Sequence, residues 1–468
     1  MLRFVVCLVT LVALAFGSRL TAAEKPPNVV LIVADDLGCF ELGCYGQTKI
    51  KTPNIDKLAE DGMKFTRFYS GCPVCAPARC TLMTGKHTGH ATVRNNVQFK
   101  KGEEGQFPIR AEDTTVTELL KDKGYVTGAM GKWGLGNWDT TGSPLKHGFD
   151  LFYGYNCQAH AHSHYPTHIY RNDKRIDLKD NDGKTGKQYT QDMFEAEALG
   201  FIETNKAKAF FLYLPFTVPH VAVQVPEDSL AEYKGKLGDD AAYDGKKGYQ
   251  PHPTPHAAYA AMVTRMDRSV GRIVEKLKAA GLDKNTLVLF TSDNGPTHNV
   301  GGADSTFFQS AGALRGLKGS VYEGGIRVPL IASMPGTIKP GTSDVPFYFP
   351  DMLPTLCEFA GAKTPDKLDG ISFWPTLIGA KQPAHDFLYW EFPGYGGQQA
   401  VIAGEWKAVR QALGKGVVKT ELYNRAKDES EKEDVSAKNP DVLTSLEKLL
   451  KEQHTPNPDF PLQTIDRK

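Results

Sequence analysis

Four runs of apolar residues in the chain end in polar residues that can carry chemistry. Residues 28–34 (NVVLIVA) form a continuous apolar run before two aspartates, which is typical of a strand buried on both faces of a parallel sheet. Three further runs have the same form, at residues 125–130, 209–214 and 286–290. The polar residues after the four runs are Asp35-Asp36, Gly131-Lys132-Trp133, Pro219-His220 and Ser292-Asp293-Asn294-Gly295. In open α/β sheets sites lie beyond the carboxyl ends of the strands, so these residues are expected to converge.

Helical patterns alternate with these runs, at residues 54–60, 115–123, 190–204 and 257–280. Strands that alternate with helices predict an α/β fold, here a large, mostly parallel sheet sandwiched by helices. The Gly-, Lys- and Asp-rich segment at 235–255 is predicted to be a surface loop.

The pattern changes after residue 349. It indicates a helix at 351–359, short strands at 387–391, 400–402 and 406–410, and a closing amphipathic helix at 442–451. These elements predict a smaller C-terminal α+β domain with an antiparallel sheet at 350–468, beside a larger domain at 24–349. The charge run at 427–434 is predicted to be a solvated loop.

The first 23 residues are predicted to be a secretory signal peptide, because one arginine precedes a short apolar run and small residues follow it. The protein is therefore expected to be exported, to the periplasm or the extracellular space. No later segment approaches the ~20 apolar residues of a membrane span, which argues against a stable membrane anchor. Lysine and arginine total 55 against 54 aspartates and glutamates, so bulk charge does not indicate nucleic-acid binding.

Three of the seven cysteines left after the signal peptide lie within nine residues, at Cys72, Cys75 and Cys80. An odd number cannot all pair within one chain. A local disulfide, structural thiols or a chemical role for one of them are the alternatives. The CxxC pair also suggests redox or zinc chemistry, for which His87 and His90 supply partners only loosely.

Asp35, Asp36, Asp293 and Asn294 together offer three carboxylates and an amide oxygen. Such a set suits a hard divalent cation, Ca²⁺ or Mg²⁺, better than zinc. Either pair alone is more often a turn, and their occurrence at two strand ends favours the metal site.

The motif CAPAR at residues 75–79, followed by TLMTGK, resembles the C-x-P-x-R…T-G motif of the type I sulfatases of the alkaline phosphatase superfamily. The resemblance continues in family order through NVVLIVADDLG, GAMGKWGLG, PFTVPH, TSDNG, GLKGSVYEGGIRVP and ELYNRAKDESEKEDV. It covers nearly the whole chain after the signal peptide. The larger domain would then be the catalytic sulfatase domain.

The resemblance implies that a formylglycine-generating enzyme oxidises Cys75 to formylglycine (3-oxoalanine), whose hydrate is the nucleophile. Cys75 would join the four oxygen donors as a metal ligand. Arg79 would fix and balance the diol, Lys132 and Lys318 would hold sulfate oxygens, and His220 would protonate the leaving oxygen. Pro77 suits the first turn of a helix that directs backbone N–H groups at the anion.

One position departs from the family. Many relatives read GKWHLG where this chain has GKWGLG, so the histidine that contacts the diol is replaced by Gly134. The histidine-rich loop at 155–170 supplies His160 and His162, which would share one face if the loop were extended and could replace it or bind substrate as part of the pocket. The alternative is a surface loop or incidental metal binding.

These observations predict an exported, arylsulfatase-like enzyme that hydrolyses sulfate esters of a small molecule or, more specifically, a sulfated carbohydrate. One alternative keeps the fold but cleaves phosphonate or phosphate esters. Another is a non-catalytic protein that binds sulfated glycans, if Cys75 stays unconverted. Selectivity is expected in the loops at 160–170 and 235–255 and in the smaller domain.

Overall fold

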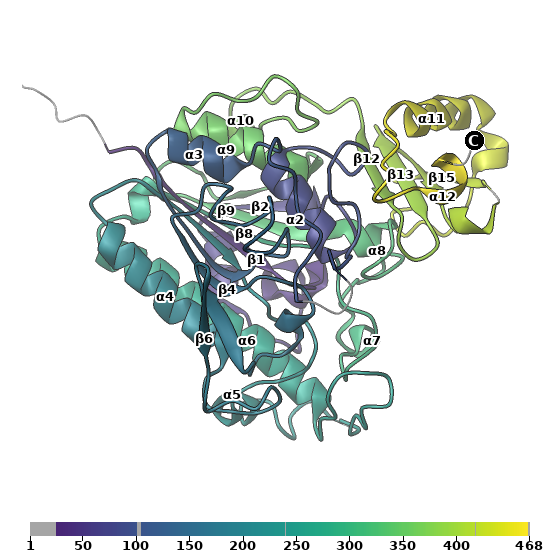
Figure 1. Cartoon of the computed structure of the whole chain (residues 1–468). Coiled ribbons are helices and arrows are strands. Elements are labelled where there is room, and N and C mark those ends of the chain that lie inside the picture. The colour runs from purple at the N-terminus through teal and green to yellow at the C-terminus, as the bar shows by residue number, and fades with distance from the viewer. Residues whose placement is uncertain (1–24, 101–103, 239, 417, 467–468) are drawn as a thin grey trace, which may run out of the picture.

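In the computed structural model, which describes residues 25–100, 104–238, 240–416 and 418–466, helices cover both faces of a large mixed β-sheet, and a smaller sheet lies beside it (Figure 1). The predicted signal peptide lies outside the described residues. Within the described residues, no helix has the length and apolar character needed to cross a bilayer.

The large sheet has the strand order β10-β2-β9-β8-β1-β7-β3-β4-β5-β6, with β11 paired to β2. The neighbours β8, β1, β7, β3 and β4 run parallel, whereas β9 is antiparallel to β8 and to β2, and β5 is antiparallel to β4 and β6. The strands are β1 (Asn28–Ala34), β2 (Met63–Tyr69), β3 (Val126–Lys132), β4 (Leu151–Tyr155), β5 (His168–Arg171), β6 (Lys174–Asp177), β7 (Phe210–Pro215), β8 (Thr286–Ser292), β9 (Arg327–Ser333), β10 (Gly341–Ser343) and β11 (Phe347–Tyr348).

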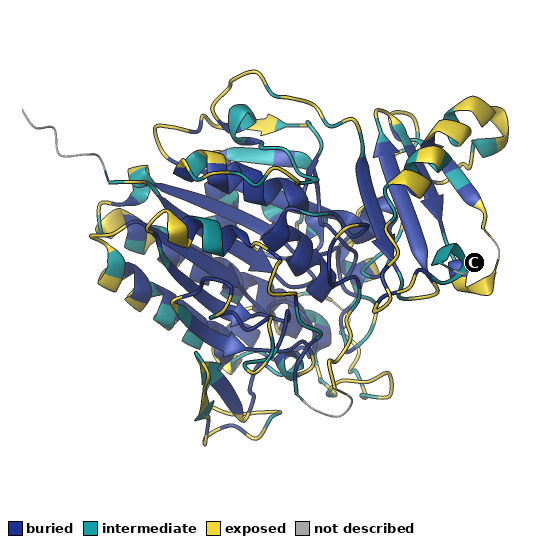
Figure 2. Cartoon of the chain, turned by 45° about the horizontal axis from the view of Figure 1, so that its top comes forward, coloured by how far each residue is buried: buried dark blue, intermediate teal, exposed yellow. Residues whose placement is uncertain are grey.

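The central strand β1 explains why the apolar run is continuous. Val29, Leu31 and Val33 belong to the hydrophobic core on one face, and the alternate residues belong to the core on the other face. Side chains of a strand point to opposite faces in turn, so a strand between two helical layers must be apolar throughout. The predicted α/β fold is thereby confirmed, and Figure 2 shows the buried strands inside partly exposed helices.

The helices form the two outer layers. Helices α1, α4 and α6 pack on one face, and α2, α3 and α9 on the other. The helices are α1 (Pro53–Glu60), α2 (Cys75–Thr84), α3 (Val116–Asp122), α4 (Thr190–Asn205), α5 (Glu227–Leu230), α6 (Pro255–Ala279), α7 (Ser305–Phe308), α8 (Glu323–Ile326), α9 (Met352–Ala360), α10 (Trp374–Leu377), α11 (Pro440–Glu452) and α12 (Gln463–Asp466).

The smaller sheet is an antiparallel meander in the order β12-β13-β14-β15, against which α11 packs. Its strands are β12 (Leu388–Phe392), β13 (Gln398–Ala403), β14 (Trp406–Arg410) and β15 (Thr420–Asn424). Sequence reasoning did not predict β15, because only Leu422 and Tyr423 form an apolar signal within it.

The chain after the predicted boundary at 349/350 stays with the large sheet. Helix α9 packs against α2 and α3, and Leu353 and Leu356 belong to the core on that face. The antiparallel sheet begins only at Leu388.

Buried charges connect the two sheets. Lys407 of β14 pairs with Glu323 of α8 at 3.0 Å and with Glu431 at 2.8 Å, and all three side chains are fully buried. Glu431 lies in the charge run at 427–434, so the prediction of a solvated loop was wrong for this residue. Removing one partner of such a buried group leaves an uncompensated charge, which is strongly destabilising.

Candidate active site

The acidic residues meet at one edge of the large sheet. Strands β1 and β8 pair in parallel with Ala34 opposite Ser292, so the residues that follow them leave the sheet side by side. Asp35, Asp36 and Asp293 are fully buried there, and the Asp36 backbone N–H donates to Asp293 Oδ1 at 3.2 Å.

This cluster fits a divalent cation. Ligand atoms of Asp35, Asp36, Cys75 and Asp293 all lie within 4.8 Å of one another. The adjacent Asn294 donates through Nδ2 to Asp36 Oδ1 at 2.8 Å, whereas its own Oδ1 is buried and has no hydrogen-bond partner. Carboxylate oxygens with one free amide oxygen are the donor set of a hard divalent ion.

Arg79 lies on the same helix as Cys75, α2, and holds the acidic cluster in place. Its Nε and Nη2 donate to Asp293 Oδ2 at 3.1 and 2.8 Å, and its Nη1 donates to the carbonyl oxygen of Lys132 at 2.8 Å. The guanidinium is fully buried, so its charge is balanced mainly by Asp293. Arg79 thereby ties together α2, β3 and the end of β8.

Two lysines pair with the other two carboxylates. Lys132 Nζ contacts Asp35 Oδ2 directly, and Lys318 Nζ lies 2.8 and 2.9 Å from the two carboxylate oxygens of Asp36. Burial alone would raise the pKa of Asp36, but the pKa lies below its usual value, and the charge and hydrogen bond of Lys318 are the main opposing cause. The three carboxylates and three cations therefore balance in charge.

Cys75 is the first residue of α2 and is buried, with Sγ 3.5 Å from Asp35 Oδ1. Burial raises the pKa of the thiol to about 12, although Lys132 and Lys318 oppose the shift. The backbone N–H of Ala76 donates to Asn96 Oδ1 at 2.8 Å. Of the N–H groups at the start of the helix, this one is therefore already occupied by Asn96.

His220 lies in the loop after β7, with Nε2 3.6 Å from Asp36 Oδ2 and Nδ1 donating to the Val221 carbonyl oxygen. The His162 ring stacks on it, with ring centroids 4.7 Å apart and an angle of 13° between the planes. Burial lowers the pKa of both imidazoles to about 3, and nearby lysines add to the effect. Both rings are therefore neutral in the free site.

The structure separates the two histidines proposed to replace the one missing at Gly134. Residues His160–His162 form a 3₁₀ turn, η3, rather than an extended loop. A 3₁₀ turn has three residues per turn, so residues two apart point in different directions. His162 points to His220, whereas His160 pairs with Glu104 at 3.3 Å, so the expectation of a shared face was wrong.

A glutamine occupies the space beside Gly134. A Cβ added to Gly134 would lie 1.9 Å from Gln158 Nε2, and the glycine has φ +77°. Both amide atoms of Gln158 are buried without hydrogen-bond partners in the described structure. Nothing in the sequence pattern links Gln158 to Gly134, because only the pairing of β3 and β4 brings the two segments together.

The family model of sulfatases matches residues 27–362. The chain belongs to the sulfatase family. A second family model, of the C-terminal region of N-sulphoglucosamine sulphohydrolase, matches residues 317–456. The enzyme is accordingly a sulfuric ester hydrolase of the alkaline-phosphatase-like fold.

Individual relatives cover most of the sulfatase. The N-acetylgalactosamine-6-sulfatase of Mus musculus is 32% identical over 427 residues, which are 85% of this chain and 74% of the relative. Arylsulfatase A of Homo sapiens is 32% identical over 428 residues, 85% of this chain and 77% of the relative. The crystal structure of Ps i-CgsB matches with a TM-score of 0.78 and 30% identity, and the match covers 94% of both chains.

Two tyrosines that sequence reasoning missed flank the cluster of the sulfatase. Tyr249, on the loop at 235–255, lies 5.6 Å from the His162 ring and 6.2 Å from the His220 ring. Tyr395 reaches over from the smaller sheet, because a Cβ on Gly319 would lie 2.1 Å from its ring, and it is 65% exposed. The sequence pointed to them only indirectly, because selectivity was expected in the loop at 235–255, which holds Tyr249, and in the smaller domain, which holds Tyr395.

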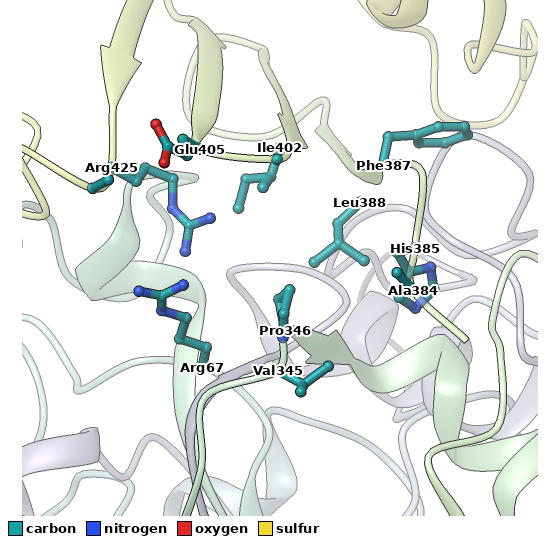
Figure 3. A pocket seen from close by; sticks show the side chains of 12 residues that line it. Arg67, Val345, Pro346, Ala384, His385, Phe387, Leu388, Ile402, Glu405 and Arg425 are labelled. Carbon is teal, nitrogen blue, oxygen red and sulfur yellow. The ribbon is translucent and has the colours of Figure 1, made fainter. Parts of the chain in front are cut away.

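A pocket of about 390 Å³ lies elsewhere in the sulfatase, between the edge of the large sheet and the smaller sheet. Figure 3 shows the guanidinium groups of Arg67 and Arg425 directed toward each other at one side of it, with Val345 and Pro346 beside Arg67. None of the predicted site residues lines this pocket, so the chemistry of the acidic cluster identifies the candidate active site.

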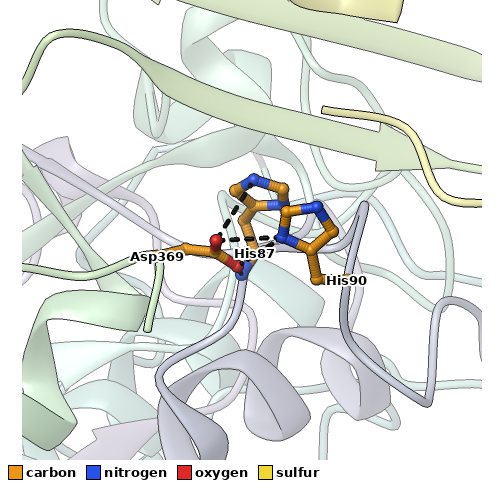
Figure 4. A group of neighbouring side chains, drawn as sticks. All are labelled: His87, His90 and Asp369. Carbon is orange, nitrogen blue, oxygen red and sulfur yellow. Dashed lines mark hydrogen bonds and ion pairs between the residues drawn. The ribbon is translucent and has the colours of Figure 1, made fainter. Parts of the chain in front are cut away.

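The zinc alternative for the CxxC pair finds no support. His87 and His90 lie beside Asp369 and not beside a cysteine (Figure 4). His87 Nδ1 accepts from the Gly89 N–H at 3.1 Å, and His90 Nδ1 lies 2.9 Å from Asp369 Oδ1. All seven cysteines of the described residues are free thiols.

Proposed function

We propose that this sulfatase removes sulfate from a sulfated carbohydrate, with Cys75 converted to formylglycine and with Ca²⁺, or Mg²⁺, bound at Asp35, Asp36, Asp293 and Asn294. The observation that carries the proposal is the meeting of Cys75 with three carboxylates and three cations in one buried cluster. A bound divalent cation would leave this balanced cluster with a net positive charge. Such a site attracts an anionic ester and stabilises charge that develops on its oxygens.

A bound divalent cation would act as a Lewis acid toward a sulfate oxygen. The hydrate of formylglycine would provide a hydroxyl group as the nucleophile. Lys132 and Lys318, which pair with Asp35 and Asp36, would be free to contact sulfate oxygens if a cation bound at these carboxylates. Arg79 keeps Asp293 in place for the cation through its two hydrogen bonds.

His220 would donate a proton to the leaving alcohol oxygen. Its imidazole is neutral in the free site, because burial and Lys318 lower its pKa. The arriving sulfate brings negative charge close to the ring, which favours the protonated form. Protonation of His220 is thus coupled to substrate binding.

Aromatic side chains support a carbohydrate substrate. Tyr249 and Tyr395 present rings at the rim of the cluster, and aromatic residues commonly line binding sites for small molecules. Among the relatives, one is named for N-acetylgalactosamine 6-sulfate, and Ps i-CgsB is also solved in complex with k-i-k-neocarrahexaose. The predicted signal peptide supports export, and conversion of Cys75 requires a formylglycine-generating enzyme during maturation.

Rates on a sulfate ester and a phosphate ester of the same alcohol test this proposal, together with mass spectrometry of the peptide that contains Cys75. We expect the sulfate ester to react faster and the peptide to have the mass of the aldehyde. A faster phosphate ester would favour the phosphate or phosphonate hydrolase. An unconverted thiol without turnover would favour a sulfated-glycan-binding protein.

Substitution at His162 and at Gln158 should distinguish which group serves in place of the missing histidine. Only the imidazole of His162 can accept a proton, so His162→Gln should lower kcat about 100-fold with little change in KM. Gln158→Leu removes two free hydrogen-bonding atoms and should mainly raise KM, by about tenfold. Steady-state kinetics on both variants measure the separate changes in kcat and KM, and thermal unfolding checks that each variant is folded. An unchanged kcat in His162→Gln would exclude this histidine as the base.

A further inference from the structure

Two groups of two histidines and one carboxylate lie outside the active site within the described ranges. They contain the same types of ligand but differ in their hydrogen bonds. In the group of His87, His90 and Asp369, each ring is held by hydrogen bonds, including one from His87 Nε2 to Gln453 Oε1 at 3.3 Å. The second group consists of Glu104, His160 and His168.

The second group brings its three ligands close together from three segments. Glu104 Oε1 lies 3.3 Å from His160 Nδ1, and Glu104 Oε2 lies 3.1 Å from His168 Nε2. The two imidazole rings are stacked, with centroids 4.1 Å apart. The Tyr155 ring packs nearly perpendicular to the His160 ring, with centroids 4.9 Å apart.

Several polar atoms of this group are buried without a hydrogen bond. Within the described residues, His160 Nε2 has no partner, and Glu104 Oε1 and His160 Nδ1 form an ion pair at 3.3 Å but neither makes a hydrogen bond. Buried polar atoms without a partner destabilise a fold. A ligand that contacts these atoms would remove that cost. The rings of His87 and His90 already make hydrogen bonds, so a ligand there would bring no comparable gain.

We propose that Glu104, His160 and His168 form a second metal site, which takes Zn²⁺ or a similar borderline divalent cation. Two imidazole nitrogens and one carboxylate oxygen, with a fourth position left for water, are typical zinc ligands. The site differs in kind from the oxygen-rich cluster at the ends of β1 and β8, which suits a hard cation. Glu104 is 30% exposed, which gives the ion a path from solvent.

The position of this site connects it to the active site. The turn η3 begins at His160 and ends at His162, whose ring stacks on His220. The loop of Glu104 also reaches the neighbour of Gly134, because Gln106 Oε1 accepts the Gln158 backbone N–H at 3.2 Å. A metal bound here would hold the turn that presents His162.

Zinc titration of the full, Ca²⁺-saturated protein tests the proposal, because excess Ca²⁺ keeps the oxygen-rich cluster occupied. Isothermal titration calorimetry should detect one Zn²⁺ per chain. Glu104→Gln and His168→Gln should each weaken Zn²⁺ binding at least about tenfold and abolish the rise in Tm on zinc addition. The matched control His90→Gln removes the same ligand type from the other group and should leave the affinity unchanged.

Equal affinity in the wild type and in both ligand variants would overturn the proposal, as would no Zn²⁺ binding or a loss confined to His90→Gln. Anomalous diffraction from zinc-soaked crystals of the wild-type protein locates the bound Zn²⁺, so the proposal can be tested even if a variant does not fold. The peak should lie between Glu104, His160 and His168, and a peak only elsewhere would refute the site.

Discussion

Cys75→Ala should abolish sulfate ester hydrolysis and leave the protein folded. If Cys75 is the precursor of the nucleophile, turnover falls by about 10⁴-fold or more, as for other enzymes that lose their nucleophile. The fold should tolerate the change because the hydrogen bond that Sγ makes, to Asp35 Oδ1, is long at 3.5 Å, and alanine suits a helix. Initial rates on a sulfate ester and the midpoint of thermal unfolding measure the two effects.

Cys80→Ala is the matched control for this prediction. Cys80 lies on the same helix, α2, is fully buried, and has its pKa raised to about 12 by burial, as Cys75 does. Its side chain belongs to the core and does not join the acidic cluster. We expect Cys80→Ala to cost some stability and to retain turnover. Full activity of Cys75→Ala, or equal loss in both variants, would contradict the assignment of the nucleophile.

The convergence of acidic residues at one end of the sheet could be predicted because each apolar run is followed directly in sequence by its acidic residues. The runs before Asp35 and Asp293 are apolar throughout, and the structure gives strands Asn28–Ala34 and Thr286–Ser292 that are buried on both faces. Once both strands are parallel, their carboxyl ends must lie at one edge, and the residues after them meet. Periodicity thus predicted that these residues could converge, and the resemblance to sulfatases supplied their expected roles.

The parts that were missed depend on contacts between distant segments. Gln158 lies beside Gly134 because β3 and β4 pair, and Tyr395 reaches the rim because the smaller sheet packs beside Lys318. The direction of His160 depended on a 3₁₀ turn where an extended loop was assumed. Such features come from tertiary packing, which the spacing of residues in the sequence does not encode.

Asp293→Asn should lower both the stability and the Ca²⁺ affinity of the sulfatase. The carboxylate accepts two hydrogen bonds from Arg79 at Oδ2 and one from the Asp36 N–H at Oδ1. An asparagine of the same shape must direct its NH₂ group at one of these donors. Arg79 also loses its main charge partner while it remains buried, a change that costs about 3 kcal/mol. Unfolding in urea with a chelator present measures the stability loss without the metal.

Asp36→Asn separates the loss of a metal ligand from the loss of a structural partner. Asp36 pairs with Lys318, whose side chain is 11% exposed and can turn toward solvent when the carboxylate is neutralised. Both variants should bind Ca²⁺ more weakly and turn over about 100-fold more slowly, but only Asp293→Asn should be strongly destabilised in chelator. Stoichiometric Ca²⁺ in both variants, measured by elemental analysis, would refute the assigned ligands. Equal stability of the two variants in chelator would instead show that Arg79 does not depend on Asp293, because the neighbouring Asp35, 3.9 Å from its Nη2, would then be a sufficient partner.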